Sequence, residues 1–162
     1  MKILITIAIV LTPMLSMAAD TSLLEIRKLF YEASKDSDAA NELNQILVDS
    51  ITTGDITLQG YKAMALMLLA KHSYNPYKKL DLFNQGKLLL DGSIYIAPEN
   101  IELRYLRYTV QCEAPYILNY RYALSADLNF INARLETLID LDLKNRIEKF
   151  FIQKSDNTAK AN

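Results

Sequence analysis

Cysteine and histidine are almost absent from the sequence, which contains only Cys112 and His72. A single thiol cannot form an internal disulfide, so packing alone must hold the fold together. One imidazole without a second soft ligand does not supply the ligand set of a zinc site, and no loop has the acidic pattern of a calcium site. We therefore expect no metal and no cofactor.

Catalytic motifs are missing as well. The sequence has no glycine-rich phosphate loop and no nucleophile elbow, so we expect no catalytic residue. Cys112 lies between Val110 and Ala114 in a helical pattern, which favours a small core residue over a reactive thiol. A nucleophile and base pair formed by Cys112 and His72 is the alternative, although only composition points to it.

The N-terminus has the layout of a secretory signal peptide. Lys2 is followed by an apolar stretch from Ile3 to Leu15, and Ser16-Met17-Ala18 places small residues before a cut after Ala18. We expect residues 1–18 to be removed and the protein to be periplasmic or secreted. An uncleaved N-terminal anchor is the alternative. No later apolar stretch is long enough to span a membrane.

Positive charge is not in excess. The chain has 18 basic and 19 acidic residues, and cleavage would remove Lys2 and leave a net charge of −2. Nucleic-acid binding requires a clustered positive surface, so we expect no nucleic-acid partner.

The remaining chain predicts an all-α fold of about seven helices in a domain over residues 19–154. Residues 155–162 lack apolar content and are predicted to be disordered. Helix starts are indicated by a capping box of Ser22 and Glu25, and then by Ser37, Ile56, Asn75 with Pro76, Glu99 with Asn100, Ser125 and Asp142. The third helix should end at His72, and Pro115 should stop the fifth before an aromatic loop containing Tyr116, Tyr120 and Tyr122.

Apolar spacing predicts the buried face of each helix. The predicted inward residues are Leu23, Ile26, Phe30, Ala33, Ala40, Leu43, Ile46, Leu47, Tyr61, Met64, Leu68, Leu80, Phe83, Leu90, Ile94, Leu103, Leu106, Val110, Leu128, Ile131, Leu135, Leu138, Leu143, Ile147, Phe150 and Phe151. Short connections between such helices favour antiparallel pairs.

The segment 86–98 resembles the second half of a tetratricopeptide repeat. Gly86 and Ser93 are small residues seven apart, with Leu90 between them and Pro98 five residues later. A helical glycine costs about 1 kcal/mol relative to alanine, so Gly86 predicts a close helix contact. The sequence therefore predicts a short tetratricopeptide-like array of helix pairs. A non-repetitive helical bundle is the alternative.

A second resemblance covers nearly the whole mature chain. The segment 61–80, with its Asn75-Pro76-Tyr77-Lys78-Lys79 turn, and the segment 101–111 resemble an exported protein family of Bacteroidota-type bacteria. The downstream residues Pro115, Leu118 and Tyr120 match the same pattern. The resemblance implies export and a helical fold, and it implies no catalytic residue.

A cluster of basic and aromatic residues is the candidate binding groove. Tyrosine and arginine dominate binding hot spots because they join a broad contact area to directional hydrogen bonds. We expect Arg104 and Arg107 to hold an acidic protein segment, or else to pair with carboxylates such as Glu102 and Glu113 while Tyr105 and Tyr108 are core. The whole predicted groove is Lys71, Tyr74, Tyr77, Lys78, Lys79, Arg104, Tyr105, Arg107, Tyr108 and Gln111.

These features favour a non-catalytic protein-interaction module of the bacterial cell envelope. A small-molecule or lipid carrier is one alternative, and an enzyme of unrecognised type is another. An enclosed apolar cavity between helices would favour the carrier, whereas an open, polar-rimmed groove would favour the module.

Overall fold

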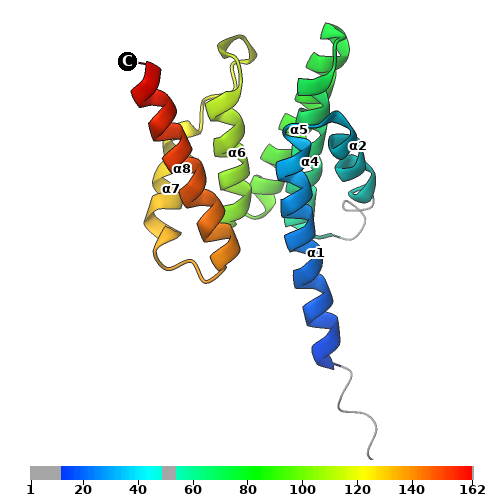
Figure 1. The fold of residues 1–162 in the computed structure, drawn as a ribbon, viewed down its shortest axis with the longest axis vertical. Coiled ribbons are helices and arrows are strands. Elements are labelled where there is room, and N and C mark those ends of the chain that lie inside the picture. The colour runs from blue at the N-terminus through cyan, green and yellow to red at the C-terminus, as the bar shows by residue number, and fades with distance from the viewer. Residues whose placement is uncertain (1–11, 49–53, 162) are drawn as a thin grey trace, which may run out of the picture.

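The computed structural model describes the backbone of residues 12–48 and 54–161 and the side chains of residues 23–48 and 54–157. This part of the chain forms seven α-helices and one short 3-10 helix, without a β-strand (Figure 1). The elements are α1 (Thr12–Ala33), α2 (Ser37–Ile46), α4 (Ile56–His72), α5 (Pro76–Ile96), α6 (Ile101–Glu113), η1 (Tyr116–Leu118), α7 (Leu124–Leu135) and α8 (Leu141–Ala161). The predicted all-α fold is confirmed.

Local capping explains most helix starts. The side chains of Asp36, Asp55, Asn75 and Asn100 accept hydrogen bonds from the first backbone N–H groups of α2, α4, α5 and α6. These bonds satisfy donors that have no partner inside the helix. Pro76 occupies the first turn of α5, where its missing N–H does no harm.

Three predicted boundaries differ from the structure. Helix α1 runs through Ser22 from Thr12, so the predicted capping box does not start it. Helix α7 begins at Leu124 after Ala123, which provides no side-chain cap, and Ser125 lies inside the helix. Helix α8 continues to Ala161, through the segment predicted to be disordered. Of the expected signal peptide, residues 1–11 lie outside the described residues, and residues 12–18 form the first part of α1.

Consecutive helices pack as pairs. Helix α1 contacts α2, α4 contacts α5, and α6 contacts α7, and the pairs meet mainly through α4 and α6 (Figure 1). The arrangement is consistent with a helical repeat-like array. A Cβ atom at Gly86 would lie 2.6 Å from the carbonyl oxygen of Ala63 and 2.7 Å from Cγ of Met67. The predicted close contact at Gly86 is therefore present, between α5 and α4.

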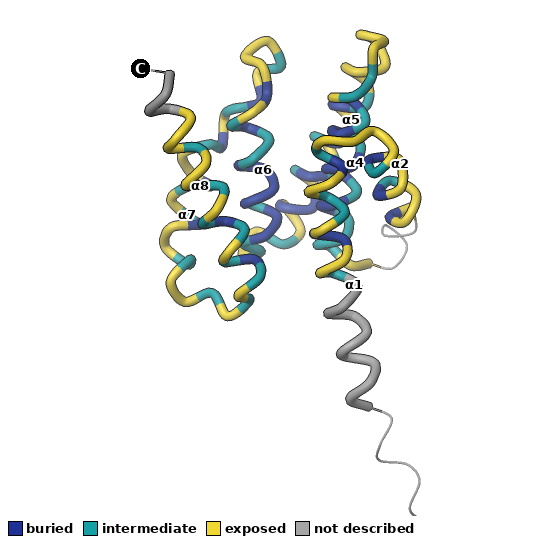
Figure 2. The backbone as a smooth tube through the Cα atoms, in the orientation of Figure 1, coloured by how far each residue is buried: buried dark blue, intermediate teal, exposed yellow. Residues whose placement is uncertain are grey.

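Two apolar cores share helix α6, which carries many of the buried residues of the fold (Figure 2). The larger core joins α1, α2, α4 and α5 and receives Leu103 and Leu106 from α6. The smaller core joins α7 and α8 and receives Tyr105 and Tyr108 from α6. Helix α6 is thus buried on several sides and is the central element of the fold.

Two predicted core residues are exposed. Ile46 keeps 55% of its surface exposed and Leu80 keeps 50%. Both lie near a helix end, where fewer neighbours are available to cover a side chain. In the predicted aromatic loop, Tyr120 is fully buried while Tyr116 and Tyr122 are exposed.

None of the helices in the described part of the chain is both long and apolar enough to cross a membrane.

Candidate functional site

Helix α6 carries half of the predicted groove, and its surroundings decide what those residues can do. Asn100 Oδ1 accepts hydrogen bonds from the backbone N–H groups of Glu102 and Leu103, which fixes the start of the helix. Glu102, Arg107 and Gln111 are buried together with the apolar residues of the same helix. Charged groups in such a position must find partners, because desolvating an unpaired charge is costly.

The first buried network is built around Arg27 of α1. Its Nε and Nη2 atoms each donate to a different carboxylate oxygen of Glu102 at 2.7 Å, the bidentate geometry that suits a guanidinium best. The Tyr61 hydroxyl also donates to Glu102, at 2.6 Å. Arg27 further donates to Asp140 at 2.7 Å and to Asp142 at 3.2 Å. One arginine thereby ties α1 to α6 and to the start of α8.

Electrostatics in this network keep Arg27 charged and Tyr61 neutral. Burial alone would lower the pKa of Arg27, but hydrogen bonds from its guanidinium to Glu102 and Asp140 raise that pKa above its ordinary value. Burial raises the pKa of Tyr61 well above its ordinary value, and the neighbouring Glu102 carboxylate adds to the effect. Tyr61 is therefore a neutral hydrogen-bond donor and does not act as a base.

The second buried network lies on another side of α6. Asp127 of α7 is fully buried and accepts from Arg107 Nε at 2.7 Å and Nη2 at 2.8 Å, and from Arg104 Nη1 at 3.1 Å. Arg107 also reaches Asp91 of α5 at 3.2 Å, and Tyr120 donates to the same Asp91 oxygen at 3.0 Å. Both arginines are neutralised inside the fold.

These contacts do not fit the predicted groove on α6. Arg107 is 8% exposed, and Arg104 is held by Asp127 and by the carbonyl oxygen of Pro98 at 2.7 Å. The two arginines therefore face partners within the chain and not an open groove. The alternative that they are structural fits the geometry, although the partners are Asp127 and Asp91 and not Glu102 or Glu113.

The other α6 residues of the predicted groove are interior. Tyr105 and Tyr108 are each 8% exposed, and their rings pack edge to face on Phe150 with centroids 6.0 Å apart. Burial raises the pKa of both tyrosines to about 12. Gln111 is fully buried, and its two amide atoms have no hydrogen-bond partner among the described residues.

The basic turn between α4 and α5 is separate from these residues. Tyr74 is fully exposed, Tyr77 is 86% exposed, and Lys78 and Lys79 are exposed beside them, while Lys71 donates to the carbonyl oxygen of Ser34 at 2.6 Å. Arg107 meets α5 at Asp91, about 20 Å along the helix from Lys78 at 1.5 Å per residue. The structure thus divides the predicted groove into an exposed turn and a buried helix.

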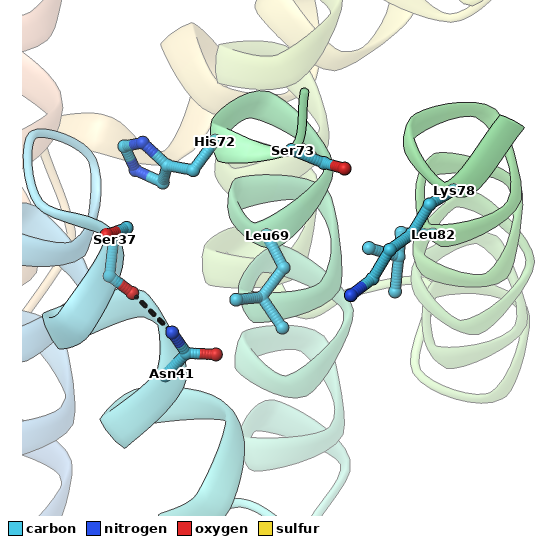
Figure 3. Close-up of a pocket in the computed structure, with 7 residues that line it drawn as sticks. All are labelled: Ser37, Asn41, Leu69, His72, Ser73, Lys78 and Leu82. Atoms are coloured by element: carbon cyan, nitrogen blue, oxygen red, sulfur yellow. Dashed lines mark hydrogen bonds between the residues drawn. The ribbon is translucent and has the colours of Figure 1, made fainter. Parts of the chain in front are cut away.

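An open pocket adjoins the turn and includes one predicted site residue, Lys78. It has a volume of 360 Å³ and lies between α2 and α5 over α4 (Figure 3). We call it the α2–α5 trough, and its lining residues are Ser37, Asn41, Leu69, His72, Ser73, Lys78 and Leu82. Leu69 and Leu82 supply the apolar surface, and the other five residues are polar. His72 Nε2 lies 2.9 Å from the carbonyl oxygen of Ala33, which ties the ring to the end of α1.

Cys112 and His72 belong to different parts of the fold. Cys112 packs against the smaller core around α8, whereas His72 lines the α2–α5 trough. Burial raises the pKa of the Cys112 thiol, which disfavours the nucleophilic thiolate. The two residues therefore do not form a nucleophile and base pair. No group of three or more metal-binding side chains occurs in the part of the chain that the structure describes.

Sequence reasoning missed Asp127, Arg27 and Asp91 as partners. One signal was present in α6 itself, whose apolar residues form two stripes, with Leu103, Leu106 and Val110 on one and Ile101, Tyr105, Tyr108 and Cys112 on the other. A helix that packs on two opposite sides leaves only narrow strips between its neighbours, so the charged residues in those strips come close to other helices. The pattern does not identify the partners, which lie on other helices.

Comparison of the chain with protein-family models, curated protein sequences and solved structures finds no match.

Proposed function

We propose that this protein is a non-catalytic interaction module of the bacterial cell envelope, and that it binds a segment of a partner protein in the α2–α5 trough. The observation that carries the proposal is that the trough is open to solvent. Leu69 and Leu82 form its apolar surface, and Ser37, Asn41 and Lys78 add polar groups beside it (Figure 3). A carrier for an apolar small molecule would instead enclose its ligand in a mostly apolar cavity.

The lining indicates the chemistry of the bound segment. An apolar side chain would cover Leu69 and Leu82, and the backbone of the segment would meet the hydrogen-bonding groups of Ser37, Asn41 and Ser73. Lys78 is exposed and has no carboxylate partner among the described residues. An acidic residue next to the apolar anchor would therefore find a counter-ion there. Lys78 is therefore the cation that we propose for an acidic partner, since Arg104 and Arg107 are bound to Asp127.

The fold and the N-terminal sequence support the rest of the proposal. Stacked helix pairs present extended surfaces without needing a reactive group. The tetratricopeptide-like spacing of Gly86, Leu90, Ser93 and Pro98 supports the same interpretation. The signal-peptide pattern over residues 1–18 and the resemblance to an exported family support a place in the envelope.

Site-specific photocrosslinking tests the trough. We expect a benzoyl-phenylalanine at Asn41, which is exposed on the rim, to give a discrete protein adduct when the bacterial envelope is irradiated. The matched control is Asn84, which is also exposed but projects from another face of α5, two residues beyond Leu82. Adducts of equal yield at both positions, or none at Asn41, would contradict the proposed site.

A further inference from the structure

Two connections at one end of the molecule present exposed apolar and aromatic side chains. The α4–α5 turn exposes Tyr74 and Tyr77 at 103% and 86%, and the α6–α7 connection exposes Tyr116 and Ile117 at 80% and 90%. Figure 1 shows both connections at the same end of the longest axis, beyond the bodies of the helix pairs. We call these four residues, together with Leu80, the tyrosine end. Its residues protrude, so it is not a groove for an extended segment.

Positive charge accompanies the tyrosine end. Lys78 and Lys79 are exposed on the first turns of α5, and neither has a carboxylate partner among the described residues. The guanidinium of Arg121 lies 3.9 Å from the ring centroid of Tyr116 and donates to the carbonyl oxygen of Ala114 at 3.0 Å. A cation is thus held against the ring at the second connection as well.

Acidic groups near these connections do not cancel the positive charge. Glu113 forms an ion pair with Lys154 at 3.3 Å, and Asp81, which keeps its charge, accepts a hydrogen bond from the neutral amide of Gln85 at 2.9 Å. Lys78 and Lys79 outnumber Asp81 on the first turns of α5, so this end presents an excess of positive charge to a negatively charged surface.

We propose that the tyrosine end docks the protein on an anionic phospholipid surface. Tyrosine suits the interface of a bilayer because its ring is apolar and its hydroxyl remains hydrated. Ile117 and Leu80 would bury aliphatic surface among the acyl chains, while Lys79 meets lipid headgroups and Arg121 adds positive charge beside Tyr116. A flat bilayer can contact two protruding connections at once, which a narrow peptide cannot do.

The absence of tryptophan from the sequence makes this surface directly measurable. Tyr77→Trp and Tyr116→Trp each place one fluorophore at a different connection. Both residues are exposed, so neither change should disturb the fold. We expect the emission of both proteins to shift to shorter wavelength when phosphatidylglycerol vesicles are added, and to shift less with phosphatidylcholine vesicles.

Tyr95→Trp is the matched control, because Tyr95 is 88% exposed near the opposite end of α5. Its emission should not change, even if the apolar N-terminal stretch itself inserts into the bilayer. The proposal is overturned if the emission of Tyr77→Trp or Tyr116→Trp does not change, if that of Tyr95→Trp shifts equally, or if both vesicle types act alike. Equal shifts with both vesicle types would show that the protein adsorbs without recognising the lipid headgroup. Unchanged emission of Tyr77→Trp and Tyr116→Trp would show that the tyrosine end binds no bilayer, and a protein would then be the partner to test.

Charge reversal tests the electrostatic part. In the Tyr116→Trp protein, Lys79→Glu should raise the lipid concentration needed for half of the shift by about fivefold or more, since each surface cation contributes about that factor. Lys79 does not line the α2–α5 trough. The result is therefore independent of the crosslink at Asn41, and the two proposals can fail separately. An unchanged midpoint would exclude attraction between Lys79 and the headgroups.

Discussion

Gly86 and Gly92 occupy the same helix but have opposite surroundings. A Cβ atom at Gly86 would meet the backbone of α4, whereas a Cβ atom at Gly92 would have no atom within 4 Å. Glycine is unfavourable inside a helix because it loses more conformational freedom on folding than alanine does. Gly86 is therefore useful only through the close approach of α4 and α5 that it permits, and Gly92 has no such compensation.

The same substitution should then have opposite effects at the two positions. We expect Gly86→Ala to lower the free energy of unfolding by about 1–3 kcal/mol through overpacking. Gly92→Ala should raise it by about 0.5–1 kcal/mol through helix propensity. Urea denaturation of both variants and the wild type measures this. A higher midpoint for Gly86→Ala would show that α4 and α5 are not in close contact at that position.

At the scale of single elements, the helix boundaries that the sequence predicted best are those set by local groups. Helix α4 was predicted over Ile56–His72 and is found there, and Asn75 with Pro76 starts α5 as predicted. In the second case, the capping side chain and the N–H groups that it satisfies are neighbours in sequence. Ser125 failed as a cap because a serine near a helix start can equally lie within the first turn, and nothing local distinguishes the two positions.

The environment of α6 was harder to predict because it depends on distant residues. Arg27 lies 75 residues before Glu102, and Asp127 lies 20 residues after Arg107. Charged residues on helices are mostly exposed, so the pattern alone favoured a solvent-facing or ligand-binding role. For the same reason, the residues of the predicted groove fall into two separate places in the structure. The exposure of the turn at Lys78 follows from its local sequence, whereas the burial of Arg104 depends on α7.

The link between α6 and α7 can be tested at Asp127. Asp127→Ala would leave the buried Arg107 without its main partner, and we expect the free energy of unfolding to fall by about 3–5 kcal/mol. Glu99→Ala is the matched control, since Glu99 pairs with Arg134 on the surface at 2.6 Å with 74% of its own side chain exposed. That change should cost less than about 1 kcal/mol. Equal losses in denaturant melts would mean that burial of the Asp127 network contributes little.

At the scale of the whole molecule, Arg27 joins the first described helix to the last. It donates to Asp140, 113 residues later, and to Asp142, 115 residues later. Arg146 of α8 strengthens the junction by donating to Asp142 at 2.7 Å and to the carbonyl oxygen of Arg27 at 3.1 Å. The two ends of the array are therefore held together by charged groups as well as by the shared helix α6.

This junction should make stability depend on pH. Burial alone would raise the pKa of Asp140 and of Asp142, but hydrogen bonds from Arg27 and Arg146 outweigh it and lower both below the ordinary value of 3.8. A carboxylate whose pKa is lower in the folded state stabilises the fold above its unfolded pKa. The contribution is lost as the pH falls through the folded pKa. The junction should therefore be intact at neutral pH and weaken in acid below about pH 4.

Replacing both residues with asparagine isolates this effect. Asparagine keeps the shape of each side chain, and at position 140 it can still cap α8, where Asp140 Oδ1 accepts from the Leu143 N–H. We expect Asp140→Asn with Asp142→Asn to lower the free energy of unfolding at pH 7 and to differ less from wild type at pH 2, where the two carboxylates bind more protons. Glu136→Gln, at a carboxylate with 90% of its side chain exposed, should change stability little at either pH. Urea melts at the two pH values measure the difference. If the double variant is destabilised equally at both, the carboxylates act through shape and hydrogen bonding alone, and charge does not hold α1 to α8.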